Sequence, residues 1–183
     1  MKKRINAASL ARVALGSAVI ALTSWISIPA PMPYTLQTFG IFFVLCLLGG
    51  KEGLFSVAVY VLIGAVGFPV FSGFRGGLGV LIGPTGGYIM SFILSAVIFR
   101  ICDAGGRRSF ALRMLGSLLG MALCWIGGSL WYAATVTGSV RTGFISAALI
   151  CVLPFIIPDL IKTVSAVLFA EALRRRIGRK IIG

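Results

Sequence analysis

The stretch Pro158–Arg176, PDLIKTVSAVLFAEALRRR, predicts how this chain folds. Its apolar part, residues 158–173, begins near an acid and an amine, Asp159 and Lys162, and is followed by three consecutive arginines. With its flanks it approaches the roughly 20 residues that a helix needs to cross about 30 Å of hydrocarbon. The stretch therefore predicts a membrane-spanning helix whose cationic end lies in water.

The composition of the whole chain agrees with this interpretation. Of the 183 residues, 58% are hydrophobic and 11% are charged, and the net charge is +13. Soluble domains carry about 25% charged residues, so a soluble globule is excluded. The mean hydropathy of +1.05 excludes a nucleic-acid-binding protein as well. Six spans use about 120 residues, so we expect residues 1–183 to form a single integral membrane domain.

Apolar runs separated by proline- and glycine-rich segments predict the other spans. The six predicted spans are residues 8–28, 35–49, 53–69, 83–101, 112–134 and 158–173. The first run exceeds the 7–15 residues or so of a signal-peptide core, so we expect it to be a retained helix. The run 144–154 is short for a seventh span and fits a half-inserted or surface-lying helix. The fold class is therefore all-α, a six-transmembrane-helix bundle.

The lysines and arginines orient these spans. Fourteen of the 17 fall on the side that contains both termini, whereas Arg75 and Arg141 fall on the other side and Lys162 lies within the last span. Cytoplasmic loops are rich in Lys and Arg, so we expect both termini in the cytoplasm. A long, structured loop between the third and fourth spans, residues 70–82, then faces outward. Attraction to anionic lipid is compatible with the same charges.

Several kinds of chemistry lack the residues they need. The chain has no histidine, and its four cysteines (Cys46, Cys102, Cys124 and Cys151) form no C-x-x-C pair. We therefore expect no zinc, no iron–sulfur cluster and no other cofactor, with the thiols acting as small hydrophobic groups. Four scattered acids also argue against an intramembrane lipid-modifying enzyme. We expect Glu52 and Glu171, which lie beside basic residues, to be solvated, and Asp103 to cap the fourth span.

Asp159 and Lys162 are the strongest candidates for ligand binding. Residues three apart share a helix face, and ionisable groups in a span usually face a partner or a watery cavity. In the alternative, Pro158 and Asp159 simply begin the helix and Lys162 reaches outward to water. That alternative explains Asp159 but explains Lys162 poorly.

The outer ends of the neighbouring spans contribute further candidates. Thr35 and Gln37 begin the second span, although they can equally serve as a helix cap and as a bond to a neighbouring helix. The glycine-rich run 72–88 lacks the ending of a phosphate-binding P-loop. We expect it to fold back into the mouth of the bundle, where Phe71, Phe74 and Tyr88 supply apolar walls.

These features together resemble the BioY family, the biotin-specific substrate-binding (S) components of energy-coupling factor (ECF) transporters. The resemblance covers almost the whole chain and rests on Ile26–Pro29 (ISIP), Pro33–Thr38 (PYTLQT), Gly64–Phe71 (GAVGFPVF), Gly76–Gly79 (GGLG), Gly83–Tyr88 (GPTGGY), Pro154-Phe155 and Pro158–Lys162 (PDLIK). It implies a multi-pass protein of a bacterial-type cytoplasmic membrane, with biotin held under the loop between the third and fourth spans.

The resemblance also implies roles for residues. Asp159 and Lys162 engage the ureido ring of biotin, and Phe71 and Tyr88 face its thiophane ring. The valerate carboxylate meets loop N–H groups, Gln37 or Arg75. Candidate substrate-binding residues are thus Asp159, Lys162, Gln37, Thr35, Tyr88, Phe71, Arg75, Gly83 and Thr85. Two departures stand out: the segment 71–75 lacks the asparagine of some relatives, and Trp25 replaces a polar residue that is frequent there.

The same resemblance suggests partners and leaves alternatives open. The small residues Ala7, Ala11, Ala14 and Ala18 are candidates for docking onto a transmembrane coupling subunit, which acts with a pair of ATPases, although they can equally serve internal packing. A solitary transporter or a homo-oligomer remains open, as does uptake of another vitamin on the same scaffold. No catalysis and no nucleic acid is expected.

Overall fold

The computed structural model describes residues 6–28, 34–103, 109–137 and 140–177. Its helices are α1 (Ala7–Trp25), α2 (Gln37–Leu48), α3 (Gly50–Val66), α4 (Leu78–Ile82), α5 (Gly86–Asp103), α6 (Phe110–Tyr132), α7 (Val140–Cys151) and α8 (Ile156–Ile177). Within these ranges the only strands are β1 (Ser27–Ile28) and β2 (Tyr34–Thr35), an antiparallel pair in which Ser27 lies opposite Thr35. The prediction of a mostly helical chain is confirmed.

Each predicted span corresponds to one of the helices α1, α2, α3, α5, α6 and α8. Among the described residues, four helical stretches are long and apolar enough to cross a membrane: Ala7–Trp25, Gly86–Asp103, Phe110–Val136 and Gly143–Arg176. By contrast, α2 and α3 have only 12 and 17 residues. A chain of this kind is a multi-pass membrane protein.

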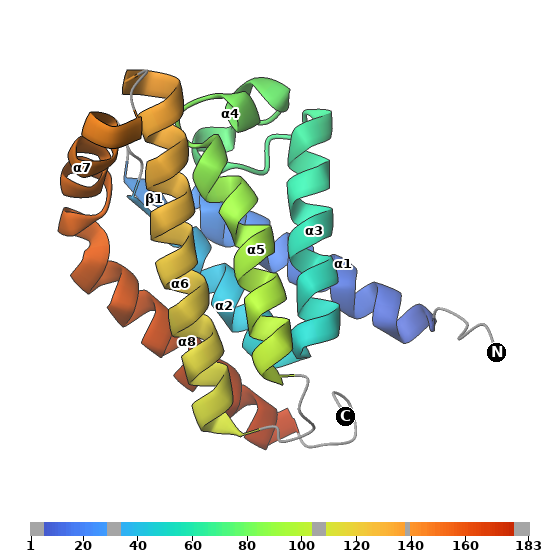
Figure 1. Cartoon of the computed structure of the whole chain (residues 1–183). Helices are drawn as coiled ribbons and strands as arrows, with labels where there is room; N and C mark the ends of the chain where they lie inside the picture. Colours follow the sequence, from blue (N-terminus) through green and yellow to red (C-terminus); the bar gives the residue numbers. More distant parts are fainter. Residues whose placement is uncertain (1–5, 29–33, 104–108, 138–139, 178–183) are drawn as a thin grey trace.

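The helices form a bundle in which α5 packs along α6, α2 along α8 and α1 along α3 (Figure 1). A sharp turn joins α2 to α3 at Gly49, whose φ of +85° suits glycine. Buried side chains of six helices meet in one core, which includes Ile20, Leu45, Tyr60 and Phe99. Small residues at these contacts let the helix backbones approach closely.

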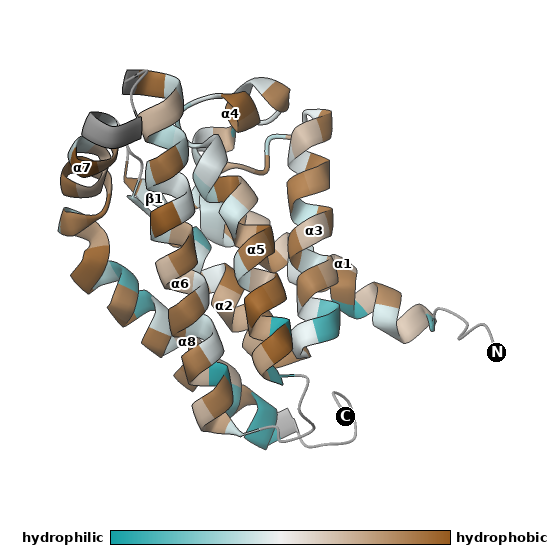
Figure 2. Ribbon diagram, viewed as in Figure 1, coloured by the Kyte–Doolittle hydropathy of each residue, from teal (hydrophilic) through white to brown (hydrophobic). Residues whose placement is uncertain are grey.

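The outside of the bundle is apolar along most of its length. Large hydrophobic side chains are exposed on helix after helix, for example Leu22 on α1, Leu62 on α3, Leu94 on α5 and Leu119 on α6. Figure 2 shows the same faces in brown, with teal at the lower ends of α3, α5 and α8. Such a belt is unfavourable in water but suits lipid tails, which are themselves apolar.

Two predicted loops contain more structure than expected. The segment 70–82 includes a 3-10 turn (Ser72–Phe74) and the short helix α4. The predicted break at 135–143 is partly helical, because α6 continues as a π-helical turn (Ala133–Thr137) and α7 begins at Val140. The predicted short helix at 144–154 is α7, and a 3-10 turn (Leu153–Phe155) separates it from α8. The proline-rich segment 29–33 lies outside the described residues.

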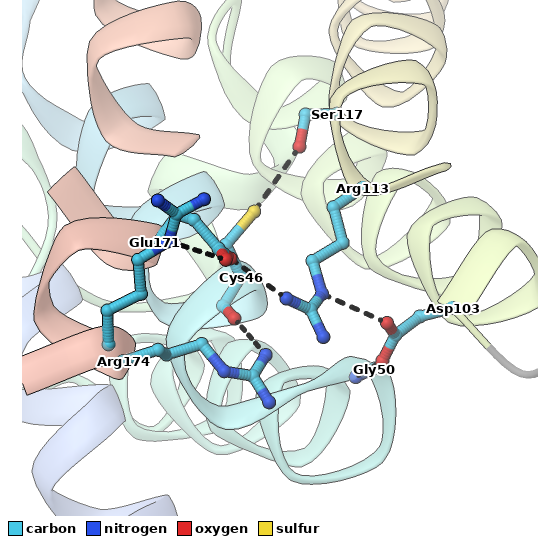
Figure 3. Close-up of polar contacts among 8 residues, drawn as sticks. Cys46, Gly50, Asp103, Arg113, Ser117, Glu171 and Arg174 are labelled. Carbon is cyan, nitrogen blue, oxygen red and sulfur yellow. Dashed lines mark hydrogen bonds and ion pairs between the residues drawn. The ribbon is translucent and has the colours of Figure 1, made fainter. Parts of the chain in front are cut away.

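The expectation that the acids near the basic residues are solvated is wrong. At one end of the bundle, Arg113 on α6 is only 4% exposed and pairs with Asp103 of α5 at 3.3 Å and Glu171 of α8 at 3.1 Å (Figure 3). The Asp103 carboxylate also accepts a bond from the N–H of Gly50, so it caps α3 rather than its own helix. Arg174 donates to the carbonyl oxygen of Cys46 on α2.

Another ion pair, separate from those of Arg113, lies at this end of the bundle, which we call the arginine end. Arg12 of α1 meets Glu52 of α3 at 2.6 Å, and Ser9 donates to the same carboxylate. The ends of α1, α2, α3, α5, α6 and α8 are therefore tied together by charge at the arginine end. Adjacent carboxylates and guanidinium groups satisfy one another there through charge-assisted hydrogen bonds, with Arg113 almost fully buried and the side chains of Arg12 and Glu52 partly exposed.

Candidate functional site

A cavity of about 430 Å³ opens between the helices at the end opposite the arginine end. Its size falls in the range of about 300–1,000 Å³ that is typical of small-molecule sites. The wall combines the beginnings of α2, α5 and α8, the later part of α6, the β1–β2 ribbon and the segment after α3. The lining residues are Ser27, Tyr34, Thr35, Gln37, Thr38, Phe71, Ser72, Gly73, Arg75, Val80, Pro84, Thr85, Tyr88, Ile89, Phe92, Met121, Cys124, Trp125, Cys151, Phe155, Asp159 and Lys162.

Asp159 and Lys162 form an ion pair in this wall. Lys162 Nζ lies 2.6 Å from Asp159 Oδ1, and the two side chains are 8% and 11% exposed. The second carboxylate oxygen of Asp159 accepts a bond from Trp125 Nε1 at 3.0 Å. One turn of helix thus presents an acceptor and a donor side by side, because residues three apart lie on the same face.

The β1–β2 ribbon holds the lysine from the other side. Lys162 Nζ donates to the carbonyl oxygen of Thr35 at 2.8 Å and lies 4.1 Å from the centre of the Tyr34 ring, a cation–π contact. Tyr34 in turn stacks on Phe155. Burial and the nearby Asp159 carboxylate raise the pKa of the Tyr34 phenol, so it keeps its proton at neutral pH.

A chain of hydrogen bonds supports the cavity floor near α3. Gln37 Nε2 donates to the hydroxyl of Tyr60 at 2.7 Å, and Tyr60 donates to the carbonyl oxygen of Val70. Ser24 of α1 donates to the same carbonyl oxygen. Gln37 therefore has a fixed orientation, because one of its amide hydrogens is already used within the protein.

The segment Pro69–Arg75, which we call the strap, lies between α3 and α4 in the chain and forms part of the cavity wall. Phe71 is 1% exposed, and its ring fills the space over Gly64, where any Cβ would collide with it. Ser72, Gly73 and Arg75 line the cavity. Phe74 does not, because its side chain is 63% exposed and stacks on Trp25 of α1 with ring centres 5.0 Å apart.

The structure brings most of the predicted site residues together. Eight of the nine candidates line the cavity: Asp159, Lys162, Gln37, Thr35, Tyr88, Phe71, Arg75 and Thr85. Gly83 does not line it; its carbonyl oxygen accepts a bond from Trp131 Nε1 and so holds the turn before α5. The prediction that Phe74 forms a cavity wall is wrong, since its ring faces Trp25 instead.

Other residues of the wall were missed from the sequence. They include Phe92 of α5, Met121, Cys124 and Trp125 of α6, and Cys151 and Phe155 near α8. Trp125 offered a signal, because an indole N–H within a span requires a buried acceptor. The others are ordinary apolar residues, whose sequence pattern does not separate a cavity wall from a core.

The four alanines of α1 lie on its outer face. Ala7, Ala11, Ala14 and Ala18 are all exposed, whereas the buried face of α1 contains Val13, Gly16, Ser17, Ile20, Ala21 and Ser24. Internal packing therefore does not explain this stripe of alanines within the described part of the chain.

This arrangement suits binding of a small molecule with both polar and apolar parts. A fixed acceptor and donor, surrounded by aromatic side chains, match a polar ring that has its own donor and acceptor close together. Among the described residues, no three His, Cys, Asp or Glu side chains cluster in a way that holds a metal ion.

Comparisons with known proteins identify the chain's relatives. The model of the BioY family matches residues 1–179. The "Biotin transporter BioY" of Thermotoga maritima is 38% identical over 170 residues, which cover 91% of this chain and 95% of that protein. The "Probable biotin transporter BioY" of Pyrococcus horikoshii is 39% identical over 171 residues, which cover 93% and 98%. The crystal structure of "the S-component for biotin from an ECF-type ABC transporter" is similar in fold, with a TM-score of 0.79, 26% identity and coverage of 96% of this chain and 95% of that one.

Proposed function

Because the chain belongs to the BioY family, we propose that its cavity is a biotin site built around the ion pair of Asp159 and Lys162. The protein takes up biotin as a substrate-binding component of the transporter type, and it is not an enzyme. The observation that carries the site assignment is a buried acid and amine, side by side in the wall of a cavity of suitable size.

The ureido ring of biotin complements this pair. The ring has two N–H donors and one carbonyl oxygen, so an N–H group meets the Asp159 carboxylate while the carbonyl meets the Lys162 ammonium. Hydrogen bonds to charged groups contribute about 1.5–3 kcal/mol. Trp125 and Thr35 support the proposal, because each holds one member of the pair in place.

The apolar body of biotin and its carboxylate find different surroundings. Phe71, Tyr88 and Trp125 supply aromatic surface for the thiophane ring and the valerate chain. Arg75 is the lining residue that suits the carboxylate, because it is cationic and exposed at the water-facing part of the wall. Gln37 is a weaker candidate, since its amide already donates to Tyr60.

We further propose that six helices, α1, α2, α3, α5, α6 and α8, cross the membrane of a bacterial-type cell. The arginine end then faces the cytoplasm with both termini, in agreement with the positive-inside rule, and the cavity opens outward. The shorter helices α2 and α3 pack against α8 and α1. The chain works as a single membrane domain.

The exposed alanine stripe of α1 supports docking onto a transmembrane coupling subunit, which acts with a pair of ATPases. Small residues at this face allow close approach of a partner helix. Uptake by the solitary chain or by a homo-oligomer is the competing arrangement, and co-purification of the chain with ATPases from its own host distinguishes the two.

Calorimetry with the purified chain tests the function. We expect tight binding of biotin, weaker binding of an analogue in which the ureido carbonyl is replaced, and no binding of unrelated vitamins such as thiamine or riboflavin. Tight binding of another vitamin in place of biotin would contradict the proposal. The variants that test the site itself are described in the Discussion.

A further inference from the structure

Two consecutive residues at the end of α1 hold the strap over the cavity. Ser24 Oγ donates to the carbonyl oxygen of Val70, and Trp25 Nε1 donates to the carbonyl oxygen of Pro69 at 2.8 Å. The Trp25 ring also stacks on Phe74. Neither Ser24 nor Trp25 lines the cavity. A helix outside the site thus anchors a part of its wall.

The two halves of the strap are held very differently. The first half is embedded, since Phe71 is buried over Gly64 and the Val70 carbonyl accepts two hydrogen bonds. The second half, Ser72–Arg75, is mostly exposed. It is held by the bond from the Phe71 N–H to the Arg75 carbonyl oxygen and by the stack of Phe74 on Trp25, and the chain directly after it is held by the bond from the Gly77 N–H to the Gly64 carbonyl oxygen.

The backbone conformation of Phe74 disfavours the present position of Ser72–Arg75. Its φ is +58°, and within the described residues it is the only non-glycine residue with a positive φ. A bulky side chain disfavours this left-handed region. The free-energy cost of this left-handed conformation is similar in size to the stabilisation that one aromatic pair contributes. The stack on Trp25 therefore offsets the backbone cost of the position that Ser72–Arg75 occupies.

We propose that Trp25 is a positioning residue that keeps Ser72–Arg75 over the cavity and thereby sets the rate at which bound substrate leaves. The proposal rests on the proposed function, because the substrate is the biotin of that site. Ser72, Gly73 and Arg75 all line the cavity. When Trp25 no longer holds Phe74, the segment relaxes outward, the cavity opens to water and Arg75 leaves the wall.

Dissociation kinetics of labelled biotin from the purified full chain provide the first test. We expect Trp25→Ala to raise the dissociation rate about three- to tenfold, the equivalent of one aromatic pair, and to change the association rate less. Trp25→Phe keeps a smaller ring and should give an intermediate rate. Phe74→Gly removes the ring but also relieves the backbone, and it leaves the bond from Trp25 to the Pro69 carbonyl oxygen intact, so it should raise the rate less than Trp25→Ala.

The double variant Trp25→Ala with Phe74→Gly should dissociate no faster than Trp25→Ala alone, because the stack of Phe74 on Trp25 is already lost in the single variant. Phe68→Ala is the matched control, since Phe68 is an exposed aromatic residue just before the strap that lies outside the cavity lining. Its dissociation rate should equal that of the unaltered chain. A partly unfolded variant lowers the number of sites but leaves the rate unchanged. Unchanged rates in Trp25→Ala and Phe74→Gly would overturn the proposal.

Thiol labelling tests the same proposal without ligand. Cys124 and Cys151 line the cavity, whereas Cys46 is buried near the arginine end. We expect iodoacetamide to modify Cys124 and Cys151 faster in Trp25→Ala than in the unaltered chain, with Cys46 unchanged, as measured by peptide mass spectrometry. Equal labelling would contradict the role of Trp25. If the unaltered chain fails to bind biotin, the proposed function fails, and the labelling still decides the role of Trp25.

Discussion

At the scale of single residues, the site depends on a buried ion pair, and burying such a pair costs free energy of desolvation. Removing two charges from water carries a large desolvation penalty, and buried pairs often add little stability over apolar residues. Here each member has one more partner, Trp125 for Asp159 and Thr35 for Lys162. The pair is therefore rigid and neutral as a unit, which suits a neutral ring with its own donor and acceptor.

Asp159→Asn and Lys162→Met should each weaken biotin binding at least about tenfold, because each removes a charge-assisted hydrogen bond. Calorimetry measures this directly. Each single variant also leaves one charge unpaired, so its thermal stability should fall. The double variant contains no unpaired charge, and we expect its stability to recover while its binding stays weak. Unchanged affinity in both single variants would disprove the site assignment.

Arg75→Gln should have a smaller effect than either change to the ion pair. Arg75 is exposed, and exposed charge pairs contribute only about 0.2–1 kcal/mol. We expect the affinity for biotin to fall about two- to fivefold. The affinity for biotin methyl ester, which has no carboxylate charge, should not change. An equal loss for the acid and the ester would show that Arg75 does not bind the carboxylate.

At the scale of the elements, α1 has three separate surfaces. Its buried face packs on α3 and α2, its last two residues hold the strap, and its alanine stripe faces outward. With 3.6 residues per turn, Ala7, Ala11, Ala14 and Ala18 form a narrow line along the helix. A partner that packs on this line approaches the same helix that anchors the cavity wall.

Ala11→Trp should block the docking of a coupling subunit while leaving biotin binding intact. The bulky ring prevents close approach of a partner helix, and Ala11 is far from the cavity lining. Co-purification with the coupling subunit measures the effect. Ala8→Trp is the matched control, because Ala8 is also exposed on α1 but lies about 100° from the line. Equal co-purification of both variants would argue against docking at this stripe.

At the scale of the whole molecule, the two ends of the bundle differ in kind. The cavity end contains one neutral ion pair and an open volume, whereas at the arginine end ion pairs and hydrogen bonds of charged side chains link six helices. Stability and binding are therefore separated in space. A substitution at the arginine end should therefore change biotin affinity little, since the effects of substitutions at distant sites are usually independent.

Arg113→Met should lower the thermal stability of the bundle with little change in biotin affinity. The change leaves the carboxylates of Asp103 and Glu171 without their shared partner, at a cost of about 3 kcal/mol for a largely buried network. Thermal unfolding in detergent measures the loss. Arg100→Met is the matched control, because Arg100 is exposed near the same end. A large loss of biotin affinity in Arg113→Met would contradict this separation.

The sequence by itself determined the helices and two of the site's central residues. Apolar runs interrupted by proline and glycine located α1, α2, α3, α5, α6 and α8, because a chain in lipid must satisfy its backbone hydrogen bonds within helices. Asp159 and Lys162 stood out for a similar reason, since a charge within an apolar run is costly and needs a partner. Both inferences depend only on local composition and spacing.

Only the tertiary structure decided how distant residues meet. Trp125 bonds to Asp159, Phe71 fills the space over Gly64, and Trp25 turns Phe74 away from the cavity. The acids at the arginine end were expected in water, but they face Arg113 and Arg12. Such contacts join helices that are far apart in the chain. Their geometry depends on how the packed helices are rotated and placed relative to one another. The spacing of residues within one helix does not specify that arrangement.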